Sequence, residues 1–161
     1  TANGKLDLSI PVKKINTKEL IKDVEISYTE NWQINHWRAI TSAYKNSPYF
    51  EFFEEEINYF YSNEFKFLLE YNTEQLKLIL KLLKVKKDIS FTTTFEKETT
   101  LTDHRNTIHP KIEFTKDKIV ASKLNTPYYQ TFESKFKFQP NLSILDLLFN
   151  KGLETVEYLK G

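Results

Sequence analysis

The sequence predicts an α/β fold in which several helices cover a small sheet, within a single domain spanning residues 1–161. Two short segments, 5–12 and 24–28, alternate apolar with other residues, which is the period of a strand. Between residues 35 and 83 the apolar residues instead recur at helical spacing. The segment ISFTTTF at 89–95 then returns to residues that favour strands. Because helical segments separate the strands, helices should pack on a sheet, and an α+β arrangement is the alternative.

The first expected elements are a turn and a strand. Asn3-Gly4 is a turn signal, and residues 5–12 follow with Leu6, Leu8 and Ile10 on one face. Pro11 marks an edge strand or the end of the strand. The chain does not begin with methionine and carries no signal-peptide pattern. We therefore expect further residues upstream of Thr1, which would supply the first strand of a hairpin.

The central part is expected to be helical after a short turn at 17–22, capped by Thr17, and a strand at 24–28. One helix should run from Asn35 to Tyr44. Pro48 breaks it, with Ser47 as N-cap and Pro48 at the first position of a helix over 48–61. That helix carries an apolar stripe opposite an acidic face, with the stripe formed by Phe50, Phe53, Ile57 and Phe60.

The second half starts with a further helical turn at 64–70. Thr73 and Gln75 then open a helix whose apolar residues are Leu76, Ile79, Leu80 and Leu83. A strand at 89–95 is followed by a long, partly irregular segment over 96–128. Loops of that length in compact domains are often functional.

Composition excludes several classes of protein. The net charge of +1 and the pI of about 7.7 leave no electrostatic signature of nucleic-acid or anionic-membrane binding. The chain has no cysteine, which excludes disulfides, thiolate nucleophiles and Cys-ligated metals. With only three glycines, it contains neither a P-loop nor a dinucleotide-binding motif. No apolar run approaches the roughly 20 residues that span a bilayer, and we expect a cytoplasmic protein.

The stretch LTDHRNTIHPK, residues 101–111, is the first candidate site. Arg105 offers a fork for phosphate or carboxylate, and Lys111 offers a point charge. Asp103 could orient Arg105 or accept a proton. The alternative is a loop held together by its own charge pairs. His104 and His109 lack the i, i+4 spacing of a helical metal pair, so no metal site is predicted.

The second candidate lies in FQPNLSILDLLFN, residues 138–150, where an aspartate stands in an apolar stretch. Ser143 and Asp146 have the spacing of a capping box, which predicts a buried helix over 144–150 that ends near Gly152. The cap alone would explain Asp146. The alternative is that Asp146 also faces a site, together with Tyr129 and Gln130.

Three blocks of sequence resemble the WbqC-like family over almost the whole chain. They are NHWRAITSAYKNSPYFEFFEEEI, DHRNTIHPK and YYQTFESKFKFQPNLSILDLLFN. The family normally starts with a segment that carries a Tyr-Phe-x-Pro-type motif and an Asn-Arg motif, which this chain lacks. The matching positions are Trp37, Tyr44, Pro48, Asp103, Arg105, Pro110, Lys111, Tyr129, Gln130, Pro140, Asn141, Ser143, Asp146 and Asn150.

The resemblance implies a transferase in surface-polysaccharide or O-antigen biosynthesis, such as one that transfers glycine or another aminoacyl group to a sugar. Arg105 and Lys111 would bind an anionic donor, and Asp146 or Asp103 would act as general base. His104 is a third catalytic candidate, and Tyr129 and Gln130 would contact the small-molecule or sugar-linked substrate. No cofactor or oligomeric state is specified. The alternative function is a non-catalytic binding or assembly protein that uses its aromatic helices as a partner surface.

Overall fold

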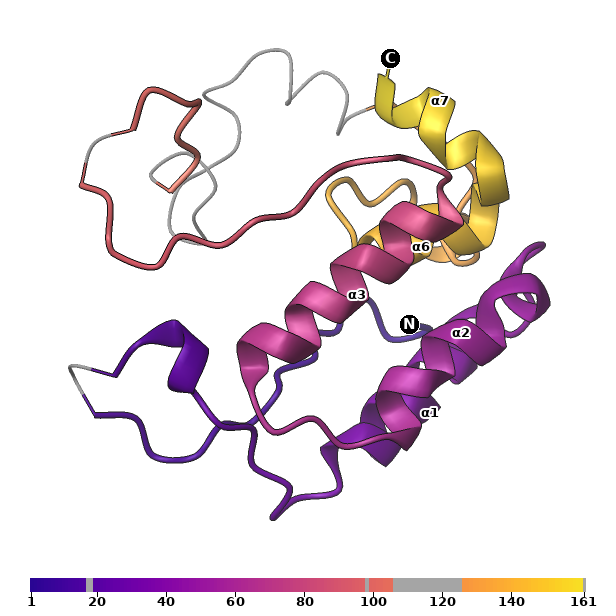
Figure 1. The fold of residues 1–161 in the computed structure, drawn as a ribbon. Helices are drawn as coiled ribbons and strands as arrows, with labels where there is room; N and C mark the ends of the chain where they lie inside the picture. Colours follow the sequence, from indigo (N-terminus) through magenta and orange to yellow (C-terminus); the bar gives the residue numbers. More distant parts are fainter. Residues whose placement is uncertain (17–18, 98, 106–125, 161) are drawn as a thin grey trace.

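The computed structural model describes residues 1–16, 19–97, 99–105 and 126–160. Within these ranges the chain is built from helices joined by extended or irregular segments (Figure 1). A 3₁₀ turn, η1 (Ile21–Asp23), precedes three long helices, α1 (Trp32–Tyr44), α2 (Phe50–Ser62) and α3 (Leu68–Leu82). The C-terminal part carries α5 (Glu133–Phe136), α6 (Ile144–Lys151), η3 (Gly152–Glu154) and α7 (Thr155–Lys160).

The predicted sheet is wrong, and so are the α/β and α+β fold classes that depend on it. None of the described segments forms a strand. Two isolated antiparallel bridges form, Val12 to Ile26 between the two segments predicted as strands and Glu25 to Phe67, where a helical turn was predicted. The amide of Ser27 donates to the Pro11 carbonyl at 2.9 Å. These contacts do not extend into a ladder because Pro11 has no amide to donate and the third segment turns directly into α3.

The segment 89–95, predicted as a strand, is irregular and exposed in the structure. Phe91 is 59% exposed and Phe95 is 84% exposed. Strand propensity largely reflects packing on a pleated, half-buried surface. No described segment offers such a surface here, so the β-branched and aromatic residues of 89–95 do not produce a strand.

The three long helices lie where apolar periodicity predicted helices, but their boundaries differ, and α5, η3 and α7 were not predicted. The first begins at Trp32, three residues before the predicted start. Ser47 does not cap α2, because its hydroxyl donates a hydrogen bond of 2.6 Å to the Tyr44 carbonyl at the end of α1. The N-cap position of α2 is instead Tyr49, whose amide donates to the Phe149 carbonyl at 3.0 Å.

Two predicted helical segments, 64–70 and the helix opening at Thr73, overlap a single helix, α3. Thr73 lies inside it and donates its hydroxyl to the Leu69 carbonyl at 2.7 Å, so it is not a cap. The predicted turn at 17–22 appears as η1, and its proposed cap, Thr17, lies outside the described residues.

The C-terminal helix α6 begins and ends as the sequence predicts. The Ser143 hydroxyl accepts from the Leu145 amide at 3.3 Å, which confirms the N-cap. The helix ends at Lys151, and Gly152 follows with a φ of +58°, a value that favours glycine. A Cβ at Gly152 would lie 2.7 Å from the Tyr49 ring, so this end of α6 rests directly against the start of α2.

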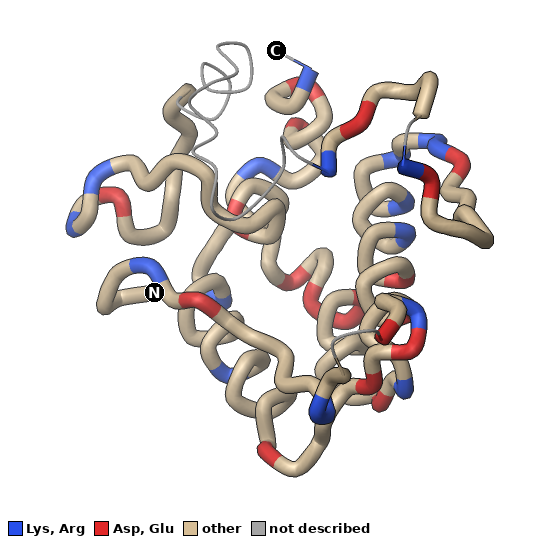
Figure 2. The backbone as a smooth tube through the Cα atoms, turned by 90° about the vertical axis from the view of Figure 1, so that its left-hand side faces the viewer, with Lys and Arg blue, Asp and Glu red and all other residues tan. Residues whose placement is uncertain are grey.

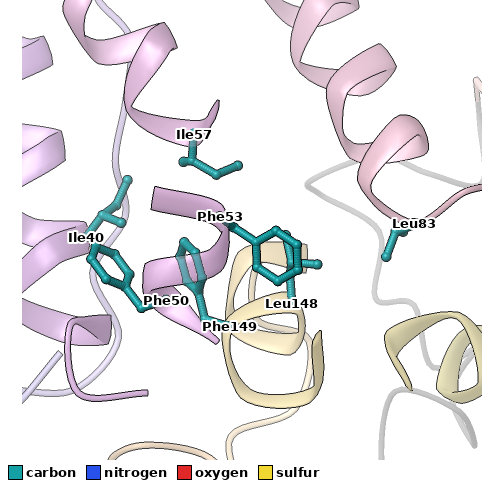
Figure 3. Close-up of a cluster of buried hydrophobic side chains, with 7 residues drawn as sticks. All are labelled: Ile40, Phe50, Phe53, Ile57, Leu83, Leu148 and Phe149. Carbon is teal, nitrogen blue, oxygen red and sulfur yellow. The ribbon is translucent and has the colours of Figure 1, made fainter. Parts of the chain in front are cut away.

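Two buried clusters hold the helices together. The larger one joins α1, α2 and α6 with the residue after α3 and consists of Ile40, Phe50, Phe53, Ile57, Leu83, Leu148 and Phe149 (Figure 3). The Phe50 and Phe149 rings lie 5.1 Å apart, which fixes α6 against α2. The second cluster contains Ile26, Trp32, Phe60 and Tyr71 and joins the extended segments to the helices.

Candidate functional site

A cavity of about 510 Å³ lies between the N-terminal segment, the three long helices and the C-terminal loop. Its lining comes from residues 1–10, from α1, α2 and α3, and from residues 130–146. A volume of this size falls within the range of small-molecule sites. The lining is mainly apolar, with polar side chains gathered in two groups.

The first polar group surrounds Asp146, which lines the cavity although it is only 3% exposed. Its Oδ2 accepts hydrogen bonds from the Tyr128 hydroxyl at 2.6 Å and from the Gln130 amide at 3.0 Å. Burial raises the pKa of Tyr44 above its ordinary value, and the adjacent Asp146 carboxylate raises it further. The pKa of Tyr128 is raised for the same two reasons. Both phenols therefore stay protonated and can donate.

Gln130 fixes the loop that carries this group. Its Oε1 accepts from the Gln139 amide at 2.8 Å, and its Nε2 donates to the Gln139 carbonyl at 2.9 Å. Asn150, one turn after Asp146, donates to the Asp146 carbonyl at 2.7 Å. Because Gln130 is 4% exposed and saturated with partners, it positions the carboxylate more than it offers atoms to a ligand.

The structure brings together two of the three residues predicted around this site. Gln130 and Asp146 are in contact, whereas Tyr129 is 57% exposed and the neighbouring Tyr128 makes the hydrogen bond. Residues two apart in an extended segment share a face. Applied to YYQ at residues 128–130, this periodicity indicates that Tyr128, and not Tyr129, lies on the same face as Gln130. The predicted capping-box bond from Asp146 back to Ser143 is replaced by these contacts.

The second polar group lines another part of the cavity and consists of His36, Tyr61, Tyr71 and Gln75. Gln75 donates to the Tyr71 hydroxyl at 3.0 Å. His36 is 8% exposed, and its ring packs edge-on against the Trp32 ring, with the two ring centroids 5.2 Å apart. Burial lowers the pKa of His36, an effect partly opposed by a hydrogen bond to the Ser9 backbone. These groups offer hydrogen bonds without a fixed charge.

The loop at 101–111 is described only as far as Arg105, and Lys111 and His109 lie outside the described residues. Arg105 donates through Nη2 to Asp103 at 2.7 Å and through Nη1 to the Glu96 carbonyl at 2.6 Å. Hydrogen bonds from Arg105 lower the pKa of Asp103 to about 2. In the part of the loop that is described, Asp103, His104 and Arg105 are exposed and are not among the residues lining the cavity.

The part of the chain that the structure describes contains no candidate metal site and no candidate membrane-spanning helix. It contains no cluster of three or more His, Cys, Asp or Glu side chains placed to hold a metal ion. None of its helices is both long enough and apolar enough to cross a membrane. Acidic and basic residues are interspersed along the described chain (Figure 2), which fits the near-zero net charge.

Comparison with known proteins gives one match. A model of the WbqC-like protein family matches residues 1–116 and 105–158, so the two matched ranges together cover nearly the whole chain. This confirms the resemblance drawn from the three sequence blocks. No curated protein and no solved structure matches the chain.

Proposed function

The chain belongs to the WbqC-like protein family, and on that premise we propose that it is a cytoplasmic transferase that moves an aminoacyl group, such as glycyl, onto a sugar during surface-polysaccharide or O-antigen biosynthesis. The observation that carries the proposal is Asp146, a carboxylate that is 97% buried yet lines a cavity of ligand size. Perturbed or buried titratable groups in cavities are the usual candidates for catalysis.

In this reaction Asp146 acts as the general base. An amine or hydroxyl of the acceptor attacks the carbonyl carbon of the activated acyl donor, forming the new N–C or O–C bond. The bond to the donor's leaving group breaks, and the acceptor's proton passes to Asp146. Tyr128 and Gln130 hold the carboxylate in one orientation, which is what a positioned base requires.

The roles predicted for Asp103, His104, Arg105, Lys111 and Tyr129 remain proposals of lower rank. Most donors of Arg105 are already engaged by Asp103 and Glu96. An anionic donor that binds Arg105 must therefore compete with these partners. Lys111 belongs to the same predicted anion site.

The test begins with a thermal-shift panel of ATP, nucleotide sugars and free amino acids. A ligand at about 100 times its Kd adds about 2.7 kcal/mol to stability, or roughly 5–10 °C for a domain of this size. With a ligand identified, mass spectrometry measures acyl transfer. We expect Asp146→Asn to slow transfer by about 10²–10⁴-fold, and Asp23→Asn, at an exposed residue outside the site, serves as the matched control. A flat panel, or full activity in Asp146→Asn, would count against the transferase.

A non-catalytic binding or assembly protein is the second candidate, and exposed aromatic side chains on α2 favour it. Phe52 is 72% exposed and Tyr59 is 53% exposed. Light scattering separates the two functions. An oligomer that Phe52→Ser dissociates, together with no response to any small ligand, would favour the assembly protein.

A further inference from the structure

Among the described residues, no positively charged side chain pairs with the buried carboxylate of Asp146. Among the described residues that line the cavity, two are acidic, Asp7 and Asp146, and two are basic, Lys5 and Lys137. Asp7 lies 3.6 Å from Lys5, and both side chains are well exposed. None of the ion pairs formed by the described residues includes Asp146. Buried charges in proteins are normally paired, so the arrangement around Asp146 is incomplete.

Neutral groups and a helix end surround the side chain of Asp146. Tyr128 and Gln130 donate to Oδ2, and the Tyr44 hydroxyl lies against the same carboxylate. Asp146 also sits in the first turn of α6, where the helix dipole favours negative charge. These contacts are all with neutral groups, and none of them brings a positively charged side chain to Asp146.

The missing cation is best matched by an ammonium group. Oδ2 already accepts two hydrogen bonds, so the carboxylate cannot offer both oxygens freely to the planar fork of a guanidinium. A calcium-like ion would need six or more oxygen ligands. A compact ammonium needs a single acceptor and fits the geometry.

The rest of the cavity specifies what carries the ammonium. Aliphatic side chains from the N-terminal segment and three helices share its wall, including Leu6, Leu8, Ile40, Ile57, Ile79 and Leu145. A free sugar would leave its hydroxyls unpaired against this surface, at a cost for each buried polar group. A hydrocarbon chain or ring would bury apolar area there instead.

We propose that the cavity binds an amphipathic amine, with its ammonium group on the Asp146 carboxylate and its hydrocarbon body along the aliphatic wall. This inference goes beyond the proposed function: it assigns the group that enters the cavity to the class of amphipathic amines, whereas the sugar hydroxyls of an acceptor stay outside the aliphatic wall.

Isothermal titration with primary n-alkylamines, from butylamine to octylamine, tests the inference. We expect Kd to fall about fourfold for each added methylene until the cavity is full. Each amine should bind about tenfold more tightly than the n-alkanol of equal length, because its hydrogen bond to Asp146 is charge-assisted. The n-alkanoates should not bind.

Two variants locate the site. Asp146→Asn should remove the preference for amines over alkanols and keep the dependence on chain length, while Asp7→Asn should change neither. Ala39→Leu, which adds volume to the lining of the cavity, should weaken binding of both amines and alkanols. It keeps the test valid if Asp146→Asn does not fold.

Several outcomes would overturn the inference. These are equal affinity for amines and alkanols, loss of the amine preference in Asp7→Asn, or unchanged binding in Ala39→Leu. The outcome for the proposed function is separate. Amine binding without acyl transfer rejects the transferase alone, whereas Asp146-dependent transfer without alkylamine binding rejects the amphipathic amine alone.

Discussion

Two aspartates, Asp146 and Asp103, occupy opposite environments in this molecule. Asp146 is 3% exposed and is held by neutral donors that come from another segment of the chain. Asp103 is exposed and is paired with Arg105, two residues away. The comparison teaches that a local charge pair can satisfy a carboxylate completely, whereas a carboxylate that is held by distant neutral groups remains available to a ligand.

The largest expected difference is in the stability contributed by the aromatic rings near the two aspartates, Phe149 beside Asp146 and Phe95 near Arg105. Phe149→Ala removes a fully buried ring from the core beside Asp146 and should lower the free energy of unfolding by about 3–5 kcal/mol. Phe95→Ala, on the exposed ring near Arg105, should change it by no more than about 0.5 kcal/mol. Urea denaturation measures both. Similar losses in the two variants would show that the Phe95 ring is packed as tightly as the Phe149 ring.

The aspartates themselves should differ next. Asp146→Ala leaves the Tyr128 hydroxyl without its acceptor and removes one acceptor of the Gln130 amide, which keeps the Gln139 carbonyl, at a cost of about 1–3 kcal/mol for a donor left unsatisfied. Asp103→Ala should leave the urea midpoint almost unchanged, because the lost pair is exposed and screened by water. A stable Asp146→Ala protein would mean that the donors find water or another acceptor.

Alkaline pH should lower the free energy of unfolding through two buried tyrosines beside Asp146, Tyr44 and Tyr128. The pKa of Tyr44 and of Tyr128 is raised in the folded protein, so the unfolded chain loses these protons earlier. Their contribution is complete below about pH 10 and is lost as pH rises above it. Chemical denaturation at several alkaline pH values should show this loss, and Tyr44→Phe should reduce it. An identical slope in Tyr44→Phe would remove Tyr44 from the cause.

The smallest effect is expected at His36, which also lines the cavity. Its pKa is lowered by burial, so the unfolded state takes up the proton more readily. The contribution of neutral His36 is complete above about pH 6.5 and is lost as pH falls through the lowered folded value. His36→Phe should flatten this part of the stability curve. NMR titration of the His36 ring gives the folded pKa, and a value at or above the ordinary one would contradict the expectation.

The sequence predicted the features that depend on neighbours along the chain. The apolar stripe of α2 and the Ser143 cap of α6 are such features, since helical periodicity and a cap are set within a few residues. The expected strands failed because a strand needs a partner, and pairing between residues far apart is not encoded in local alternation. The bridge between Val12 and Ile26 is the small part of that pairing that forms.

The candidate site was predicted in part for the same reason. Asp146 stood out as a charge in an apolar stretch, and Gln130, which the sequence analysis grouped with it, donates a hydrogen bond to its carboxylate. Tyr128 was missed because two adjacent tyrosines look alike until the extended conformation decides which one faces Asp146. The cavity itself could not be predicted, since its wall combines residues 1–10, three helices and the C-terminal loop.

The contact between Gly152 and Tyr49 has a consequence for how this sequence can change over time. A side chain at position 152 would both adopt an unfavourable φ and collide with the tyrosine ring. A replacement there becomes acceptable only after Tyr49 has become smaller or has turned away. We therefore expect these two positions, more than a hundred residues apart in the sequence, to covary among related proteins.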